Sequence, residues 1–331
     1  MPAPDPERLA AALARELGPT TIERLHRVSG GASRETWVFE AIAAEAATHR
    51  LVLRRDPGPS LGSTDRATEY HLLRAARDAG VPVPRVRLLL DPSDGLGEGF
   101  VMDHVAGETI ARRILRDGEY EQARTTLAAQ CGTIAAAIHA TPVESLPNLA
   151  IETASRQLGQ WTEIFDTFGE PHPAFEFGLR WMRRNQPEAA ESPRLVHGDF
   201  RNGNFVVGPE GIRSVLDWEL AHLGDPIEDL GWLCARAWRF GVPRVVGGFG
   251  DVESLLDAYE RAGGARPTLA ALKFWIALAT LKWGVMCLIQ AFTHLNGVVR
   301  SVELATIGRR VVENEWDLLR LLAAGPHPDA W

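Results

Sequence analysis

Two short apolar runs that end in polar residues constrain the fold of this chain more than any other feature. A run at 195–196 leads into His197-Gly198-Asp199, and Asn204 follows five residues after the aspartate. A second β-like run, 212–216, is closed by Asp217. Three fixed polar residues could arise by chance, but a second acid that closes another β-like run is much harder to obtain by accident. If the two runs are parallel strands, their loops bring these side chains within a few ångströms of one another.

This set of side chains matches the needs of phosphoryl transfer from a nucleotide. The reaction needs one carboxylate to take a proton from the attacking hydroxyl, and an amide oxygen and a second carboxylate to hold magnesium. We predict Asp199 as the general base. Asn204 and Asp217 are the expected ligands of Mg²⁺, which prefers oxygen donors. The alternatives are that Asp199 caps a turn after a strand and that Asn204 only ends a turn after Gly203.

The same segment resembles the catalytic and metal-binding loops of the aminoglycoside phosphotransferase family, a branch of the protein-kinase-like fold. The family's His-Gly-Asp is here 197–199, and its Asp-Trp plus an acid is here 217–219. The continuation at 221–230, Ala-His-Leu-Gly-Asp-Pro-Ile-Glu-Asp-Leu, is similar in particular to kinase-like domains fused to some acyl-CoA dehydrogenases. The resemblance implies an α+β, bilobal fold with an antiparallel N-lobe sheet plus a helix and a mostly helical C-lobe.

Hydrophobic periodicity in the first hundred residues agrees with such an N-lobe. After an amphipathic helix at 6–17, the pattern reads β-β-β-α-β-β. The helix at 67–79 ends at Gly80, before two prolines. The expected strands are 25–28, 35–40, 51–54, 85–90 and 99–102. We therefore predict an N-lobe at 1–103, a hinge at 104–107 and a C-lobe at 108–331. The C-lobe helices are expected at 108–117, 121–140, 151–168, 173–185, 226–240, 251–262, 268–295 and 301–323.

By this resemblance, Arg54 takes the place of the phosphate-binding lysine on the third strand of kinase-like proteins. The chain has no lysine before Lys273, so a cation from this lobe must be an arginine. Strand alternation sends Arg54 and Arg55 to opposite faces, and the pattern alone does not choose between them. The resemblance favours Arg54. Glu69 is the expected partner of that cation, although the dipole of a helix N-terminus also favours an acid there.

Further contacts to the nucleotide are expected from glycines and from the hinge. Gly30, Gly31 and Ser33, between the first two strands, would cover the phosphates with backbone N–H groups. A glycine pair in a hairpin is usually only a turn. The prediction is supported by the position of this segment, which precedes the strand that carries Arg54. The resemblance implies that adenine meets backbone groups of four residues, Met102, Asp103, His104 and Val105.

Three more residues near the catalytic motif have predicted roles. Arg201 stands where protein kinases have a lysine and could neutralise charge on the transferred phosphate; the alternative is a solvent-exposed arginine. By resemblance, His197 is a packed residue that hydrogen-bonds the loop, and Asp229 braces that loop from a following helix. Five tryptophans are expected to be core residues, some of which could wall an acceptor pocket. These are Trp181, Trp232, Trp238, Trp275 and Trp283.

Composition limits the compartment and the partners of the chain. A net charge of −8 gives no sign of a nucleic-acid surface. Three widely spaced cysteines favour a reducing cytoplasm over a disulfide framework. The apolar segment 269–295 is interrupted by Lys273, Lys282 and His294, so a buried helix is expected instead of a membrane span. We expect a cytoplasmic enzyme without nucleic-acid or membrane partners, and the sequence carries no signal of an oligomeric state.

The predicted function is that of a small-molecule kinase that uses ATP or GTP with Mg²⁺. It would transfer the γ-phosphate to a hydroxyl of a metabolite or an aminoglycoside-like acceptor. An aminoglycoside needs many acids in the C-terminal helices, but 264–300 contains none, although 301–316 supplies three glutamates. The likeness to domains linked to acyl-CoA dehydrogenases favours a hydroxyacyl-type or other metabolic alcohol.

Two other functions are possible alternatives for such a sequence. A catalytically silent nucleotide-binding module is favoured by Arg54 in place of lysine and opposed by the presence of Asp199, Asn204 and Asp217 together. A protein kinase fits less well, because 219–229 leaves no room for a long activation segment.

Overall fold

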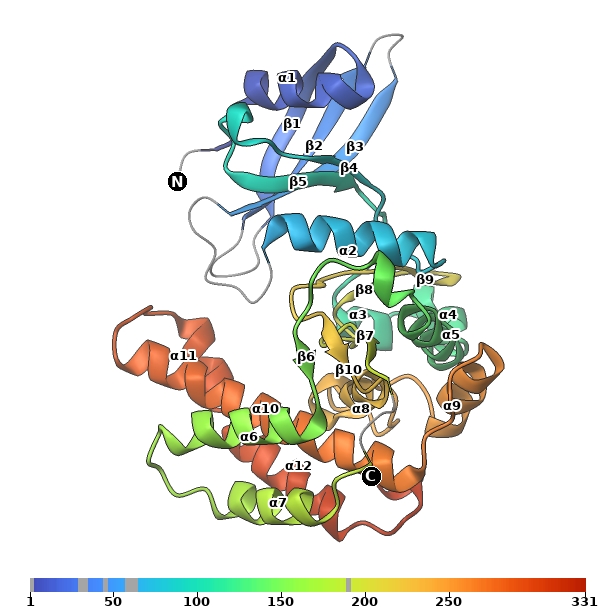
Figure 1. The fold of residues 1–331 in the computed structure, drawn as a ribbon, viewed down its shortest axis with the longest axis vertical. Helices are drawn as coiled ribbons and strands as arrows, with labels where there is room; N and C mark the ends of the chain where they lie inside the picture. The colour runs from blue at the N-terminus through green and yellow to red at the C-terminus, as the bar shows by residue number, and fades with distance from the viewer. Residues whose placement is uncertain (1–2, 29–34, 44–46, 57–64, 189–191) are drawn as a thin grey trace.

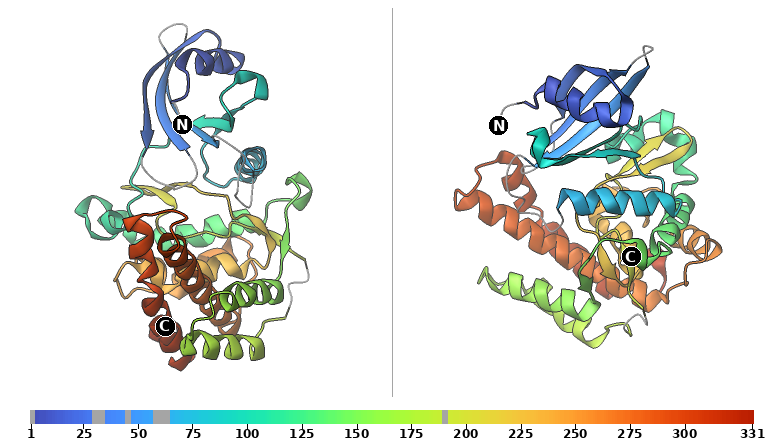
Figure 2. Two further views of the ribbon diagram at one scale, coloured as in Figure 1. Left: turned by 90° about the vertical axis from the view of Figure 1, so that its left-hand side faces the viewer. Right: turned by 45° about the horizontal axis from the view of Figure 1, so that its top comes forward.

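A five-stranded antiparallel sheet and a larger, mostly helical body divide the chain into two lobes (Figure 1). The computed structural model describes residues 3–28, 35–43, 47–56, 65–188 and 192–331. Figure 2 shows the same arrangement from two further sides. The sheet has the strand order β1-β2-β3-β5-β4. Its strands are β1 Thr20–Val28, β2 Glu35–Ala43, β3 Thr48–Asp56, β4 Val86–Leu89 and β5 Glu98–Asp103.

Alternation along the strands explains why a helix packs on each face of this sheet. Leu51 and Leu53 of β3 belong to the cluster formed with α1 (Pro6–Leu17). Val52, between them, belongs to the main core together with apolar residues of α2 (Arg66–Asp78). Successive side chains of a strand point to opposite faces. The α2 face is therefore the one turned towards the helical lobe, which Figure 1 shows below α2.

Both N-lobe helices begin at an aspartate. The Asp5 carboxylate accepts a hydrogen bond from the Glu7 backbone N–H at 2.9 Å, and Asp65 accepts one from the Thr68 N–H at 2.6 Å. Such N-caps satisfy backbone donors that the first turn leaves unpaired. The position of α2 agrees with the predicted helix at 67–79 to within one residue at each end.

The helical lobe is built around one long helix, α10 (Leu269–Leu295). This helix is long and apolar enough to cross a membrane, but 78% of its most apolar window is buried inside the protein. It therefore serves as a core helix, as predicted. The other helices of this lobe are α3 Ala111–Arg116, α4 Glu121–Arg124, α5 Leu127–His139, α6 Ala154–Asp166, α7 Pro173–Arg184, α8 Ile227–Cys234, α9 Val252–Arg261, α11 Val302–Gly308 and α12 Val311–Ala323.

Several helices are shorter than predicted, each for a local reason. The helix expected at 108–117 begins only at Ala111, because Glu108 pairs with Val207 and its carboxylate accepts the next two backbone N–H groups. The helix expected at 226–240 ends at Cys234, whose carbonyl oxygen accepts two hydrogen bonds from Arg239. The predicted helices at 121–140 and 301–323 are each divided into two. The one at 151–168 opens instead with a short strand.

Two small sheets carry the catalytic segments, and neither has the parallel arrangement expected for the two motif strands. β8 (Phe205–Gly208) pairs antiparallel with β9 (Gly211–Val215). β7 (Arg194–Val196) pairs antiparallel with β10 (His222–Gly224), which also pairs parallel with β6 (Ile151–Glu152). The two motif strands, β7 and β9, therefore lie in different sheets and do not pair with each other among the described residues. The two loops meet because β9 turns back along β8 and leaves Asp217 beside the start of that hairpin.

Glycine is required where α8 crosses α10. A Cβ built on Gly231 of α8 would lie 2.5 Å from the Cβ of Trp275 and 2.8 Å from its backbone carbonyl carbon. Backbone cannot shift as cheaply as a flexible side-chain end. Gly159 of α6, by contrast, has nothing within 4 Å of such an atom.

We expect Gly231→Ala to lower the free energy of unfolding by about 1–3 kcal/mol through overpacking. Gly159→Ala should raise it by about 0.5–1 kcal/mol, because alanine restricts the unfolded chain and favours a helix. Urea unfolding of the two variants and the wild type measures both changes. Equal stability of the two variants would show that the α8–α10 contact is not as close as described.

Candidate active site

A buried carboxylate holds the loop between β7 and β8. Asp229 of α8 accepts hydrogen bonds from the backbone N–H groups of His197 at 2.8 Å and Gly198 at 3.0 Å. Its Oδ2 also lies 3.1 Å from Nε2 of His139. Burial alone would raise the pKa of Asp229, but the His139 contact and these donors hold that pKa below its ordinary value. The carboxylate therefore stays ionised and fixes the loop.

Gly198 and His197 give this loop its shape. Gly198 has φ +79°, and a Cβ there would lie 2.4 Å from the carbonyl oxygen of Leu220. The His197 ring accepts the Asp199 backbone N–H on Nδ1 at 3.1 Å and lies 3.0 Å from the Leu216 carbonyl oxygen through Nε2. Burial lowers the pKa of His197, so the ring is neutral and Nε2 carries the donated hydrogen. His197 thus joins the two loops, in the packed, loop-holding position that was expected.

Three donors hold the carboxylate of Asp199. Arg201 Nε lies 2.9 Å and Trp232 Nε1 2.7 Å from Oδ1, and Asn204 Nδ2 lies 2.6 Å from Oδ2. The side chain remains 13% exposed, so a substrate hydroxyl can approach it. Trp232 was expected only as a core or pocket residue. Its contact with Asp199 joins residues 33 positions apart and has no local signal in the sequence.

Asn204 and Asp217 lie together at the other end of this loop. The Leu216 backbone N–H donates to the Asn204 carbonyl oxygen at 2.8 Å, which places Asp217 next to the loop. Asp217 adopts φ +69°, a left-handed conformation that is uncommon outside glycine and typical of functional positions. The Asn204 amide nitrogen donates to Asp199. The Asn204 Oδ1 accepts no hydrogen bond among the described residues.

This donor set fits a magnesium ion. It offers one amide oxygen and one carboxylate, and Mg²⁺ is usually held by one or two carboxylates plus phosphate oxygens and water. The described residues contain no group of three or more His, Cys, Asp or Glu side chains that could hold a metal. A bound ion would therefore take most of its ligands from a nucleotide and from solvent. Burial would raise the pKa of Asp217, but the Arg54 guanidinium outweighs it and lowers that pKa.

The structure separates the two arginines of β3. Arg54 lies 2.7 Å from Glu69 and 3.2 Å from Asp217, so it spans the two lobes. Its Nε is buried and has no hydrogen-bond partner among the described residues. Arg55 points to the other face, where it pairs with Glu35 at 2.9 Å. Of the two candidates, Arg54 is thus the one that faces the cleft.

The ion pair expected between Arg54 and Glu69 is present, and it belongs to a larger buried network that the sequence did not indicate. Glu69 is also bound by Arg66 of the same helix at 2.5 Å, and Arg66 reaches Asp56 at the end of β3 at 2.8 Å. The other three members of this network, Asp56, Arg66 and Glu69, are almost fully buried. The dipole of the α2 N-terminus therefore adds to, and does not replace, the pairing of Glu69.

The remaining nucleotide-binding predictions are placed only in part. Gly30, Gly31 and Ser33 lie outside the described residues. In the expected hinge, the backbone N–H of Asp103 donates to Arg85 and that of His104 donates to Arg50. Met102 lies within β5, paired with Val52 and Val86. Val105 has no backbone hydrogen bond within the described part of the chain.

An aromatic and basic layer lies behind the catalytic loop. Trp232, Trp238 and Trp283 form consecutive ring contacts, with centroids 5.4 and 4.8 Å apart. The Arg201 guanidinium lies 4.4 Å from the Trp238 ring, and Lys282 Nζ lies 5.0 Å from the Trp232 ring. The sequence showed Lys282 only as an interruption of an apolar helix. Of these two cations, Arg201 contacts the predicted base directly, and Lys282 lies on the ring that donates to it.

Lys282 belongs to a buried charge network. Its Nζ lies 3.5 Å from Glu228, which also contacts His222 at 3.1 Å and accepts a hydrogen bond from Gln157 at 2.5 Å. Burial alone would lower the pKa of His222, but the Glu228 charge outweighs it and raises that pKa. A cavity of about 480 Å³ opens beside this network and is lined by residues of α2, α6, α10 and the loop before β10.

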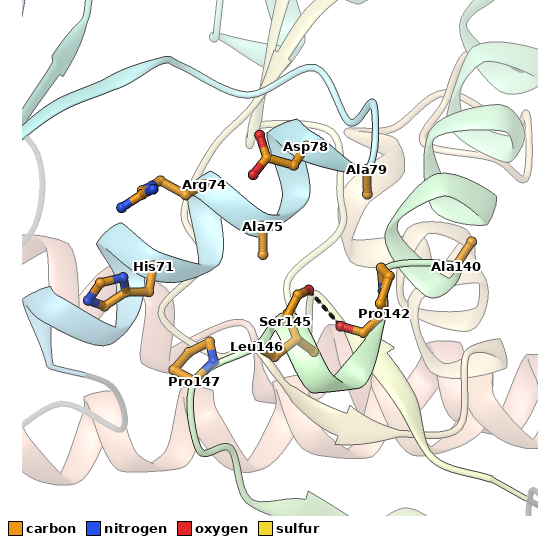
Figure 3. A pocket seen from close by; sticks show the side chains of 10 residues that line it. All are labelled: His71, Arg74, Ala75, Asp78, Ala79, Ala140, Pro142, Ser145, Leu146 and Pro147. Atoms are coloured by element: carbon orange, nitrogen blue, oxygen red, sulfur yellow. Dashed lines mark hydrogen bonds between the residues drawn. The ribbon is translucent and has the colours of Figure 1, made fainter.

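A second cavity, of about 640 Å³, lies between α2 and residues 140–147 (Figure 3). His71, Arg74 and Asp78 of α2 line it together with a turn in which the Ser145 hydroxyl donates to the Pro142 carbonyl oxygen. None of the predicted site residues lines it. We therefore do not assign it to the active site.

Comparisons with known proteins agree with the motif. The model of the phosphotransferase enzyme family matches residues 24–275. Acyl-CoA dehydrogenase family member 11 of Gallus gallus is 30% identical over 257 residues, and that of Homo sapiens is 29% identical over 251. Each alignment covers 70% of this chain and 32% of the relative. The chain thus spans about a third of the length of these curated relatives.

Solved structures of low sequence identity share the fold. A protein from Ralstonia eutropha assigned to the aminoglycoside phosphotransferases superposes with a TM-score of 0.75 at 21% identity, covering 96% of this chain and 98% of its own. A macrolide 2′-phosphotransferase from Brachybacterium faecium gives 0.62 at 21% identity, with 92% and 97% covered. An aminoglycoside phosphotransferase in complex with AMP-PNP and hygromycin B gives 0.61 at 16%, with 93% and 98% covered. The expected bilobal, kinase-like α+β fold is confirmed.

The raised pKa of His222 leads to a prediction for stability. A group whose folded-state pKa lies above its unfolded value, about 6.5 for histidine, stabilises fully below that value and less as pH rises through the folded pKa. His222→Gln should therefore cost more free energy of unfolding at about pH 6 than at about pH 9. Urea unfolding at both pH values measures this difference.

The exposed His71, on α2, provides the matched control. His71→Gln should show the same small effect at both pH values. A cost of His222→Gln that is independent of pH, or larger at high pH, would contradict the charged pair with Glu228.

Proposed function

Because the chain belongs to the phosphotransferase enzyme family, we propose that it is a small-molecule kinase that transfers the γ-phosphate of ATP or GTP to an alcohol. The observation that carries this proposal is the fixed carboxylate of Asp199. Arg201, Asn204 and Trp232 donate hydrogen bonds to it. The Leu216 N–H, bonded to the Asn204 carbonyl oxygen, places Asp217 beside the same loop. Such pre-positioning is what phosphoryl transfer requires, since catalysis there is mostly orientation and charge stabilisation.

Each residue has one task in this proposal. Asp199 accepts the proton of the acceptor hydroxyl as the oxygen attacks the γ-phosphorus and the bond to the β-phosphate oxygen breaks. Arg201, bound to Asp199 through Nε, offers its remaining N–H groups to the charge on the transferred group. Bound Mg²⁺ would neutralise phosphate charge, and Asn204 and Asp217 would hold it.

The N-lobe would hold the rest of the nucleotide. Arg54 supplies the cation for the inner phosphates, and its unpartnered Nε is a donor that a phosphate oxygen would satisfy. Glu69 keeps this guanidinium in place from α2. The Val105 N–H, which has no backbone partner among the described residues, supports an adenine contact at the hinge.

The charges around Asp199 support an uncharged or anionic acceptor more than a polycation. The nearest charged groups in the layer behind the loop are Arg201 and Lys282, and Glu228 is occupied by Lys282 and His222. An aminoglycoside with several ammonium groups would meet repulsion there. We propose a hydroxyacyl-type or other metabolic alcohol. A panel in which only aminoglycosides are phosphorylated would overturn this choice.

The central test is a nucleoside-diphosphate release assay across a diverse alcohol panel. Asp199→Asn keeps the shape of the side chain but cannot take a proton, so turnover should fall by about 10²–10⁴-fold. Nucleotide binding, measured by thermal shift, should be retained. Asp166→Asn, at an exposed position on α6, is the control and should leave turnover unchanged.

Two results would contradict the proposal. Wild-type turnover in Asp199→Asn would remove the assigned base. A nucleotide-dependent thermal shift without phosphate transfer to any alcohol would favour a catalytically silent nucleotide-binding module.

Trp232 leads to a second kinetic prediction. Trp232→Phe removes the donor to the Asp199 carboxylate, and a hydrogen bond to a charged group contributes about 1.5–3 kcal/mol. We expect turnover with saturating acceptor to fall by about tenfold or more, with little change in nucleotide affinity. The measurement is nucleoside-diphosphate release with the best alcohol of the panel.

Trp275→Phe is the matched control for this substitution. Trp275 is equally buried, and its indole N–H donates to Asp225 at 3.1 Å, away from the catalytic loop. Both variants lose packing, but only Trp232→Phe should lose turnover. Equal turnover in the two variants would show that Trp232 acts through packing alone.

A further inference from the structure

A cavity of about 850 Å³ lies between α3, the turn at 236–239, and helices α11 and α12. It is lined by more basic than acidic side chains. The acids are Glu313 and Asp317. The basic residues are Arg112, Arg236, Arg239, Arg309 and Arg310. In the linings of the cavities of about 640 and 480 Å³, only Arg74 carries a guanidinium group.

Only part of this positive charge is compensated. Arg310 pairs with Glu313 at 2.9 Å, and Arg236 pairs with Asp317 at 3.1 Å. Arg112 and Arg309 are exposed and make no ion pair or hydrogen bond among the described residues. Two guanidinium groups thus face the cavity region without a protein carboxylate.

A third, Arg239, is buried among carbonyl groups. It donates to main-chain oxygens of Cys234 and Trp331. Burial lowers the pKa of Arg239 to about 10, which still leaves it charged at neutral pH. Keeping a cation in such a place costs free energy unless an anion approaches it.

The cavity is connected to the catalytic base by an unbroken series of contacts. Arg201 joins Asp199 at 2.9 Å and lies on Trp238, which contacts Trp283. Arg310 lines the cavity and lies 6.0 Å from the Trp283 ring. An aromatic wall therefore runs from the base to the arginines. The indole N–H groups of Trp238 and Trp283 have no hydrogen-bond partner within the described part of the chain.

We propose that this cavity binds the anionic end of the acceptor, whose hydroxyl lies at Asp199 and whose middle part crosses the aromatic wall. The inference rests on the proposed kinase function. It names an acceptor class: an elongated alcohol with an apolar segment and a carboxylate or phosphate group at the far end. Guanidinium groups recognise both anions through paired N–H donors. The exposed Val312 and Trp316 at the cavity give apolar surface beside the charges.

The kinetic test compares hydroxy acids of increasing chain length with their methyl esters in the nucleoside-diphosphate release assay. Wild type should prefer the acid, expressed as the ratio of kcat/KM for acid and ester. The double variant Arg112→Gln, Arg309→Gln should lose at least about fivefold of this preference, since two charge contacts are removed. The esters should be turned over as by wild type.

Arg183→Gln, at an exposed position on α7 outside this cavity, is the matched control and should keep the preference. An acid-to-ester ratio that is the same in wild type and in the double variant would overturn the proposal. So would a wild-type preference for the ester at every chain length.

A binding test separates failure of this inference from failure of the kinase function. With AMP-PNP present in excess to fill the nucleotide site, citrate and inorganic phosphate are titrated in a thermal-shift experiment. Wild type and Arg183→Gln should be stabilised, and the double variant should not. If no alcohol is phosphorylated but this pattern holds, the kinase function fails and the anion site stands. Equal stabilisation of all three proteins overturns the site.

Discussion

The buried carboxylate of Asp229 is the interaction on which the active site depends. It takes up two successive backbone N–H groups of the catalytic loop and a histidine from α5, so three segments meet on one ionised group. Breaking one partner of a buried charge network leaves an uncompensated charge, which is why such groups fix geometry strongly. His197 extends the effect, because its ring reaches from this loop to the carbonyl of Leu216. The positions of both loops thus follow from one residue in α8.

A second constraint joins the lobes. Arg54 lies between Glu69 of the N-lobe and Asp217 of the C-lobe, so one guanidinium group forms ion pairs with both lobes. A metal ion bound at Asp217 would compete for the oxygen that Arg54 now contacts, and a nucleotide phosphate would offer Arg54 a replacement. Exchange of partners costs less than the creation of a new charge in a buried place, since each charge remains compensated. On the proposed function, bound nucleotide and metal would replace the contact between Arg54 and Asp217.

The sequence predicted the architecture and the loops because both have local signals. Hydrophobic alternation placed the five sheet strands, and the spacing of Asp199, Asn204 and Asp217 placed the catalytic loop in one pattern. The pairing of the motif strands was not predicted, because pairing partners are set by turns and long-range contacts that a short apolar run does not encode. Trp232 and Lys282 were missed as neighbours of the base for the same reason. Both are apolar-helix residues by pattern, and only the crossing of α8 and α10 brings them behind the loop.

Trp232 contacts both Asp199 and Lys282. The indole N–H of Trp232 donates to the Asp199 carboxylate, and Lys282 Nζ lies 5.0 Å from the centroid of the same ring. A cation near an aromatic face draws electron density from the ring, which makes the indole N–H a stronger donor. Lys282 Nζ also lies 3.5 Å from Glu228, which holds it beside the ring. Of the two cations beside these tryptophans, Arg201 pairs with the Asp199 carboxylate directly, whereas Lys282 pairs with Glu228 and is linked to Asp199 only through the Trp232 ring.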